Sequence, residues 1–219
     1  MSVFEKKSKN KIKRHPERAI YDKDVIYQII DEAIICHVGL TQDDQPYVIP
    51  TLFARRGDEI LLHGATTSRM IRHVVAGKEI CITMTLLDGL VMARSVFNHS
   101  ANYRSAVLYG RGRLIGSGEE KLQALKDFTE GLIPGRWEDV RKPNEKELKA
   151  TSIVSVAIEL GSAKIRQGPP GDDESDLKLP VWAGIVPISQ QIGQPIDDPK
   201  LKNGIMPPKY LQRYIRNQG

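Results

Sequence analysis

The sequence predicts an α+β protein in which antiparallel strands form a barrel with helices outside it. Apolar runs of strand length alternate with polar turn clusters, a few segments carry the period of an amphipathic helix, and no strand–helix–strand alternation is present. With 219 residues, 40% of them hydrophobic and 27% charged, the chain is long enough for one sizeable core. We therefore expect an arm over residues 1–18, one barrel domain over 19–190 and an extension over 191–219.

The predicted arm holds the whole net charge of the chain. Residues 1–18 contain seven Lys and Arg and two Glu, a balance of +5 that equals the total. Few apolar residues are present to offset the entropy of ordering, so we expect a solvated, flexible arm. A weak contact with RNA or an anionic surface is the alternative. Because the body has no aromatic-basic RNA signature, we do not expect a nucleic-acid partner.

The first half of the domain predicts a helix and then a three-stranded meander. The helix is capped by Asp22 or Asp24 and ends near residue 33, with its apolar residues on one stripe. Strands are expected over residues 34–40, 46–54 and 59–65. Pro50 cannot donate to a strand ladder, so it predicts a sheet edge, a bulge or the approach of a ligand.

The second half alternates two more helices with further strands. One helix is expected over residues 68–75, capped by Thr66 or Thr67, and a second opens at residues 117–120 and runs to about residue 132. Strands are expected over 79–87, as a pair within 103–115, and over 151–160, 163–166 and 182–188. The loop over 168–173 is rich in Gly and Pro, which suits either a lid or an inert connection.

Three short motifs stand in this order of elements: Leu-Leu-His-Gly-Ala over residues 61–65, Asn-Tyr-Arg-Ser over 102–105, and Val-Trp-Ala-Gly over 181–184. The order of elements, with Pro-Tyr-Val-Ile-Pro at residues 46–50 and Thr-Ser-Arg at 67–69, resembles the flavin-nucleotide-binding split barrels of the pyridoxamine 5′-phosphate oxidase superfamily. The three motifs are similar to those of the branch with nitroimidazole-reductase-like proteins. The resemblance covers about residues 15–190. It implies a six-stranded antiparallel split β-barrel with peripheral helices, which binds FMN in a cleft between the subunits of a homodimer.

The chemistry of a phosphate explains one part of the resemblance. Ser68 and Arg69 offer a hydroxyl, a guanidinium group and backbone amides at the start of a predicted helix, all of which bind phosphate. The resemblance assigns both residues to the FMN phosphate and adds Arg104 as a second cation. A solvated arginine is the alternative for Arg69.

The flavin ring needs polar backbone groups at its edge and apolar atoms on its faces. The resemblance places it along Val48, Ile49, Pro50 and Thr51. Further cofactor contacts are expected at His63, Gly64, Ser105 and Trp182. The alternative for Pro50 is an irregularity at a strand edge without a ligand. The alternative for Thr51 and Ser105 is that they are polar residues of the surface or barrel that do not contact a cofactor, and for Trp182 that it only packs against other side chains.

Two residues are candidates for substrate chemistry. His63 ends a strand before the phosphate turn, where the resemblance to nitroimidazole reductases implies a histidine near the flavin face, and it is the predicted catalytic residue because an imidazole can position or protonate a substrate near neutral pH. A strand-end histidine bonded to a carbonyl is the alternative. Arg166 is expected to face an anionic substrate or to form a surface salt bridge. The Arg-x-His clamp typical of the oxidase that makes pyridoxal phosphate lacks its His here, so vitamin B6 oxidation is not predicted.

The sequence thus predicts an FMN-dependent oxidoreductase that acts on an unidentified small molecule. The alternative is a non-enzymatic flavin- or haem-binding barrel, with His63 or His37 as the haem ligand. The two cysteines, Cys36 and Cys81, lack CxxC spacing, so neither a metal site nor a disulfide framework is expected. No apolar run approaches the length of a membrane span, and we expect a cytoplasmic protein.

Overall fold

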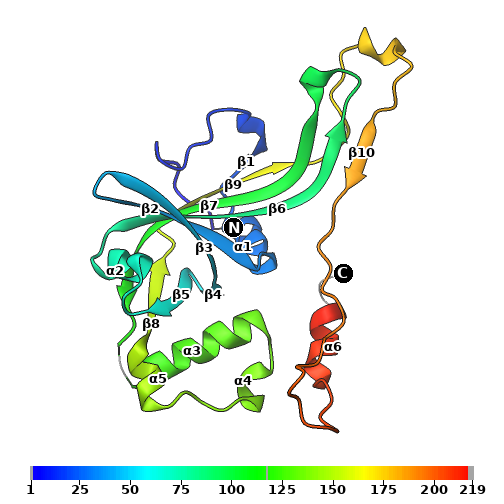
Figure 1. The fold of residues 1–219 in the computed structure, drawn as a ribbon. Coiled ribbons are helices and arrows are strands. Elements are labelled where there is room, and N and C mark those ends of the chain that lie inside the picture. The colour runs from blue at the N-terminus through cyan, green and yellow to red at the C-terminus, as the bar shows by residue number, and fades with distance from the viewer. Residues whose placement is uncertain (1, 117, 217–219) are drawn as a thin grey trace.

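The computed structural model describes residues 2–116 and 118–216 and confirms the predicted α+β class (Figure 1). The strands are β1 (Ala19–Ile20), β2 (Ile35–Gln42), β3 (Gln45–Leu52), β4 (Ala54–Arg56), β5 (Glu59–Ala65), β6 (Glu79–Met92), β7 (Ser100–Leu114), β8 (Thr151–Ala157), β9 (Leu160–Arg166) and β10 (Gly184–Pro187). The helices are α1 (Lys23–Glu32), α2 (Arg69–Val75), α3 (Glu119–Leu132), α4 (Arg136–Asp139), α5 (Glu145–Ala150) and α6 (Lys209–Arg216).

The ten strands form one antiparallel sheet that curls without closing. Its main path runs β3-β2-β6-β7-β8-β5-β4, with β9 on β7 and β10 on β6. Ten strands are present in the described residues instead of the six predicted, and the short strands β1, β4 and β10 at the edges account for three of the four additional ones. Both β3 and β4 end the path, so β3 has a strand partner on one side alone among the described residues, and Pro50 lies on an edge strand as the sequence predicted.

One long strand, β7, serves both halves of the barrel, whereas the sequence predicted a pair of strands within residues 103–115. β7 pairs with β9 along Tyr103 to Tyr109 and with β8 from Gly112 onward. The change of partner takes place around Gly110, where a Cβ atom would lie 1.9 Å from the carbonyl oxygen of Ala157. Only glycine permits the two backbones to approach this closely, so Gly110 determines how the sheet bends.

Helix α1 closes one end of the barrel core. The side chain of Asp22 accepts hydrogen bonds from the backbone amides of Asp24 and Val25, which fixes the helix start. Ile26 and Ile30 then lie fully buried in the main core. A smaller cluster that includes Leu61, Ile153 and Phe128 lies between the sheet and α3.

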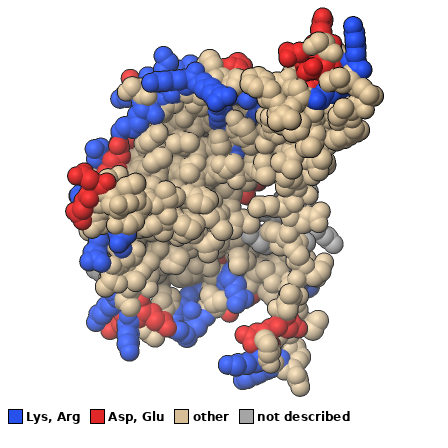
Figure 2. Space-filling model, turned by 45° about the horizontal axis from the view of Figure 1, so that its top comes forward, with Lys and Arg blue, Asp and Glu red and all other residues tan. Residues whose placement is uncertain are grey.

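The first residues of the chain lie against the body rather than forming the flexible arm that we predicted. Phe4 is 5% exposed, and a Cβ at Gly161 would lie 2.8 Å from its ring. The side chain of Asn10 is buried and donates to the carbonyl oxygens of Glu5 and Gly161, both at 2.9 Å. One aromatic and one amide therefore anchor a segment that is otherwise charged. Figure 2 shows Lys and Arg side chains gathered along the top of the molecule.

The distal part of the β6–β7 hairpin and the residues after β9 project from the body. The hairpin extends to a short turn at Val96–Asn98, and β10 pairs with β6 before the chain runs as an extended tail to α6 (Figure 1). The predicted extension over 191–219 belongs to this tail, with residues 217–219 outside the described part. In the described residues, no helix is both long and apolar enough for a bilayer.

Candidate functional site

The turn between β5 and α2 is the first element of the candidate site. Gly64 lets α2 approach β5 closely, since a Cβ there would lie 3.3 Å from Ile71 and 3.7 Å from Ser68. Ser68, rather than the predicted Thr66 or Thr67, is the N-cap of α2, and its hydroxyl makes no capping hydrogen bond. The Ser68 hydroxyl is therefore free to bind a ligand.

Arg69 joins this turn to the edge strand β3. Its guanidinium carbon lies 3.8 Å from the centroid of the Tyr47 ring, a cation–π contact. Arg69 lines an open cavity of about 320 Å³ together with Arg72 and Lys78. Arg72 donates to the carbonyl oxygen of Thr67 at 2.6 Å. Within the described chain, none of the three cations forms an ion pair, although Asp43 also lines the cavity.

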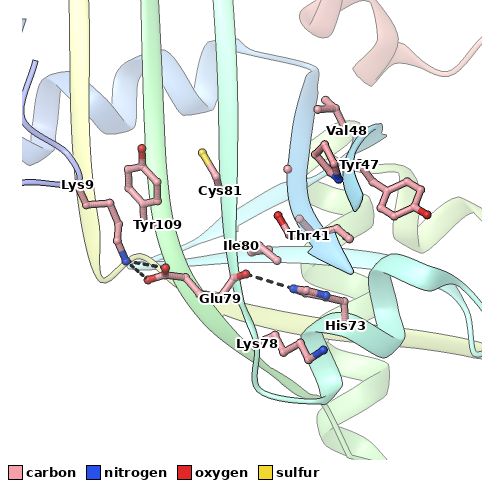
Figure 3. A pocket seen from close by; sticks show the side chains of 13 residues that line it. Lys9, Thr41, Tyr47, Val48, His73, Lys78, Glu79, Ile80, Cys81 and Tyr109 are labelled. Atoms are coloured by element: carbon pink, nitrogen blue, oxygen red, sulfur yellow. Dashed lines mark hydrogen bonds and ion pairs between the residues drawn. The ribbon is translucent and has the colours of Figure 1, made fainter. Parts of the chain in front are cut away.

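A second open cavity, of about 540 Å³, adjoins the first and shares His73 and Lys78 with it. Figure 3 shows Lys9 reaching over from the N-terminal segment to Glu79, at 2.6 Å. Lys9 also lies over the ring of Tyr109, and the walls include Thr41, Val48 and Cys81. We call the two cavities together the cationic groove.

The strand predicted to hold the flavin ring borders this groove. Along β3, Val48 and Pro50 are exposed, whereas Ile49 is half-buried against the main core. Thr51 is half-buried, and its hydroxyl donates to the carbonyl oxygen of Leu52 at 3.2 Å. The free edge of β3 therefore offers backbone donors and acceptors beside an apolar strip, as a flat polar-edged ring requires.

His63 is half-buried on the face of β5 that α3 covers. Its ring lies 4.5 Å from the ring of Phe128, centroid to centroid. The His63 Nδ1 atom is buried without a hydrogen-bond partner among the described residues, so the alternative of a carbonyl-bonded histidine is not observed. Burial lowers the pKa of His63 below its ordinary value of 6.5, which keeps the imidazole neutral near pH 7.

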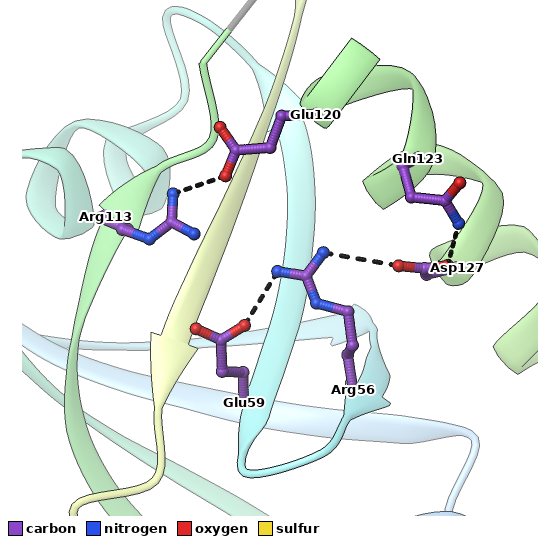
Figure 4. Close-up of polar contacts among 6 residues, drawn as sticks. All are labelled: Arg56, Glu59, Arg113, Glu120, Gln123 and Asp127. Carbon is purple, nitrogen blue, oxygen red and sulfur yellow. Dashed lines mark hydrogen bonds and ion pairs between the residues drawn. The ribbon is translucent and has the colours of Figure 1, made fainter.

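Charged contacts hold α3 against the sheet, as Figure 4 shows. Arg56 on β4 donates to Glu59 at 2.9 Å and to Asp127 on α3 at 3.4 Å. Arg113 on β7 donates to Glu120, the second residue of α3, at 2.9 Å. These contacts fix the helix that carries Phe128, and through it the environment of His63.

Arg104 and Ser105 are predicted cofactor contacts that bind other groups. The Arg104 guanidinium donates to Asp88, at 2.7 Å, and to Glu32 at the end of α1. These hydrogen bonds raise the pKa of Arg104. The Ser105 hydroxyl donates to the carbonyl oxygen of Lys164 at 3.3 Å. The structure therefore groups Ser68 and Arg69 with the β3 strand, whereas Arg104 belongs to a separate ion-pair cluster.

Arg166 also has structural partners. It donates to the side chain of Asn102 and to the carbonyl oxygens of Gly168 and Pro169, the latter two at 3.1 Å. The Asp172 side chain is 2% exposed and accepts from Arg94 at 2.8 Å. The loop proposed as a lid is thus tied to the hairpin at both ends.

Trp182 lies on the projecting part of the chain. It is 65% exposed, and a Cβ at Gly184 would lie 2.8 Å from its ring. Packing within one chain therefore leaves most of the indole uncovered.

Sequence reasoning missed Tyr47, Arg72 and Lys78. Arg72 follows Arg69 at the i+3 spacing of one helix face, a signal that was present in the sequence. Tyr47 and Lys78 come from elements on either side of α2, and no local pattern places them together. No group of three or more His, Cys, Asp or Glu suited to a metal occurs in the described ranges.

An open antiparallel barrel with helices outside it is the architecture of the split-barrel fold. The chain belongs to the pyridoxamine 5′-phosphate oxidase family, whose model matches residues 22–165. Among solved structures it is similar to the flavocytochrome Anf3 from Azotobacter vinelandii, with 39% identity over 94% of this chain and 96% of that one and a TM-score of 0.89.

Two further solved structures are similar over much of the chain. The FAD and haem binding protein from Mycobacterium smegmatis is 33% identical, over 90% of this chain and 96% of its own, with a TM-score of 0.85. A putative 5-nitroimidazole antibiotic resistance protein from Bacteroides thetaiotaomicron is 26% identical, over 67% and 86%, with a TM-score of 0.57. A search of curated proteins returned no match.

Proposed function

We propose that the protein is a flavin-dependent oxidoreductase whose flavin phosphate is bound by Ser68 and Arg69. The observation that carries the proposal is a set of cations around an open cavity that form no ion pair within the described residues, next to a Ser68 hydroxyl that makes no capping hydrogen bond. A phosphate would satisfy these groups through charge-assisted hydrogen bonds. The α2 helix has only seven residues, so the side chains rather than the helix dipole carry the argument.

The flavin ring is proposed to lie along the free edge of β3. Backbone groups of Val48 to Thr51 bind its polar edge, and the exposed side chains of Val48 and Pro50 contact its face. A bound flavin supplies hydride or electron transfer to a small substrate. The chain positions the ring, excludes water from it and sets the charge around it.

We predicted FMN from the sequence, and the groove has room for a larger flavin. Beyond Arg69, the cations Arg72 and Lys78 border a cavity that continues past Tyr47 to Tyr109. This extension suits a second phosphate and a base, and the M. smegmatis relative is an FAD-binding protein. We therefore propose that the groove accepts a flavin dinucleotide as well as FMN.

Haem binding is a second candidate function, and His63 supports it. Burial lowers the pKa of the imidazole, which favours its neutral, metal-binding form, and its Nδ1 has no hydrogen-bond partner in the described chain that would compete with iron. The A. vinelandii relative is a flavocytochrome, and the M. smegmatis relative is described as binding haem. In this case His63 would hold iron and would not protonate a substrate.

Reconstitution tests both candidates. Apoprotein is titrated with FMN, FAD and haemin, and the absorption spectrum is recorded after gel filtration. A flavin spectrum that sodium dithionite bleaches, and that a quinone or nitroaromatic compound restores, supports the oxidoreductase. A Soret band that His63→Ala abolishes, while flavin uptake is retained, supports His63 as the haem ligand. Failure to retain any flavin would overturn the first proposal.

A further inference from the structure

The N-terminal segment that carries the whole net charge of the chain is fixed in place over strand β9. The side chain of Asn10 donates to the carbonyl oxygen of Gly161 at 2.9 Å. Further along, the side chain of Lys164 donates to the carbonyl oxygen of Arg14 at 3.0 Å. The segment therefore crosses β9 as an ordered structure, and we call residues 6–14 the basic ridge.

Four cations of the basic ridge have no acidic partner. Lys6, Lys11, Lys13 and Arg14 are exposed, and none of them forms an ion pair among the described residues. Like charges that are held close together on a fixed backbone repel one another, and a bound anion relieves the repulsion. A flexible arm would let such charges spread apart, so order combined with unpaired charge indicates a binding surface.

The aromatic rings of this region are covered. Lys6 lies over the Tyr21 ring, 4.7 Å from its centroid, and Lys9 lies over the Tyr109 ring at 5.7 Å. A surface that binds single-stranded nucleic acid offers aromatic faces on which bases stack. Phe4 is buried in the main core, so its ring does not insert into a bilayer. The basic ridge thus offers chiefly fixed charge, which favours the acidic surface of a folded protein as its partner.

Lys9 joins the basic ridge to the cationic groove. It lines the cavity of about 540 Å³ and pairs with Glu79 at 2.6 Å, as Figure 3 shows. A partner on the basic ridge would therefore lie beside the groove in which we propose that a flavin binds. A flavin that reduces a small substrate needs electrons from a donor before the next turnover, and a docked protein could supply them.

We propose that the basic ridge docks an acidic one-electron carrier protein that reduces the bound flavin. The inference rests on the proposed function for what the partner delivers. Two carrier molecules are oxidised for each flavin reduced, each gives one electron, and water supplies the protons that the flavin takes up. Electron-transfer complexes are transient and bury less than about 1,200 Å², and complementary charge guides their encounter. A few unpaired cations meet this requirement without an apolar groove.

Binding to the apoprotein tests the docking surface without flavin. The probes are a plant-type ferredoxin and a flavodoxin, two small acidic carriers, titrated by calorimetry at low and at high salt. We expect an affinity that falls with salt, and the double variant Lys11→Glu and Lys13→Glu should bind about tenfold more weakly or worse. The matched control, Lys146→Glu with Lys149→Glu, changes two exposed lysines of α5 and the net charge equally, and should bind as the wild type does.

Three results would overturn the docking surface. The first is no binding to either carrier, and the second is an equal loss of affinity in the two double variants. The third is tighter binding, dependent on Lys11 and Lys13, to phosphatidylserine vesicles or to poly(U) than to the carriers. Vesicle binding would make the ridge a membrane contact, and poly(U) binding would make it a nucleic-acid contact.

Reduction kinetics test the delivery of electrons. Flavin-loaded protein is mixed with reduced ferredoxin without oxygen, and the bleaching of the flavin absorption is followed. At low salt the Lys11→Glu and Lys13→Glu variant should be reduced about tenfold more slowly than the wild type. Both should be reduced equally by photoreduced deazariboflavin, a small reductant that needs no docking surface. Equal rates with ferredoxin would overturn electron delivery. A protein that binds ferredoxin through the ridge but retains no flavin would refute the proposed function and electron delivery, whereas the docking surface would stand.

Discussion

Replacing Arg69 by alanine removes a cation that contributes little to the stability of the fold. Its guanidinium carbon lies 3.8 Å from the centroid of the Tyr47 ring, and it forms no ion pair in the part of the chain that the structure describes. The substitution should therefore change the free energy of unfolding by no more than about 0.5 kcal/mol, as for other surface changes. Any large effect on flavin affinity must then come from the bound phosphate.

The size of that effect follows from the kind of bond removed. Hydrogen bonds to a charged group contribute about 1.5 to 3 kcal/mol, which corresponds to flavin binding that is about ten- to a hundredfold weaker. Arg104→Ala is the contrasting variant, because Arg104 binds Asp88 and Glu32 instead of the groove. It should lower stability and leave flavin affinity nearly unchanged.

The assay is a fluorescence titration of apoprotein with FMN and, separately, with riboflavin. Riboflavin lacks the phosphate, so wild type and Arg69→Ala should bind it equally. Wild type should lose affinity when the phosphate is absent, and Arg69→Ala should lose much less. Equal FMN affinity in both proteins, or an equal loss of riboflavin binding, would refute the assignment of Arg69.

Three other predictions follow from the same structure. Burial lowers the pKa of His63 below 6.5, so the unfolded chain binds a proton at this imidazole more tightly than the folded chain does. The contribution of His63 to the free energy of unfolding should be fully present above about pH 6.5 and should be lost as the pH falls through the pKa of the folded state. In thermal melts, His63→Gln should show a weaker dependence of stability on pH over this range. Gly110→Ala should destabilise the fold by about 3 kcal/mol or more in urea unfolding, because its Cβ would lie 1.9 Å from the Ala157 carbonyl; a loss under about 1 kcal/mol contradicts the tight crossing. Arg72→Ala and Lys78→Ala should weaken FAD more than FMN in parallel titrations, and equal losses would argue against a second phosphate in the groove.

Local sequence patterns predicted most of the fold. The stripe of isoleucines and the Asp22 cap predicted α1, and the polar cluster after β2 predicted the hairpin turn, where Asp43 and Asp44 take positive φ values of 51° and 58°. These features depend on neighbours a few residues apart, so the sequence alone expresses them. The turn that carries Ser68 and Arg69 was found for the same reason.

The features that the sequence did not predict depend on contacts between residues far apart in the chain. Arg104 was expected at the phosphate, but its partner Glu32 lies 72 residues away and Asp88 at a β-bulge, and no local pattern brings the three together. The charged N-terminal segment was expected to be flexible, whereas the buried Phe4 and Asn10 fix it to the body. Hydrophobic periodicity did not predict the projecting tail, because its apolar residues have neither the spacing of a helix face nor that of a strand face.

The central claim is that the cationic groove binds a flavin, and a visible absorption spectrum of the protein as purified tests it most directly. We predict flavin bands that disappear on reduction, with acid extraction releasing FMN or FAD, and we predict that Arg69→Ala is purified with much less of this colour. A colourless protein that stays colourless after incubation with FMN and FAD would contradict the account.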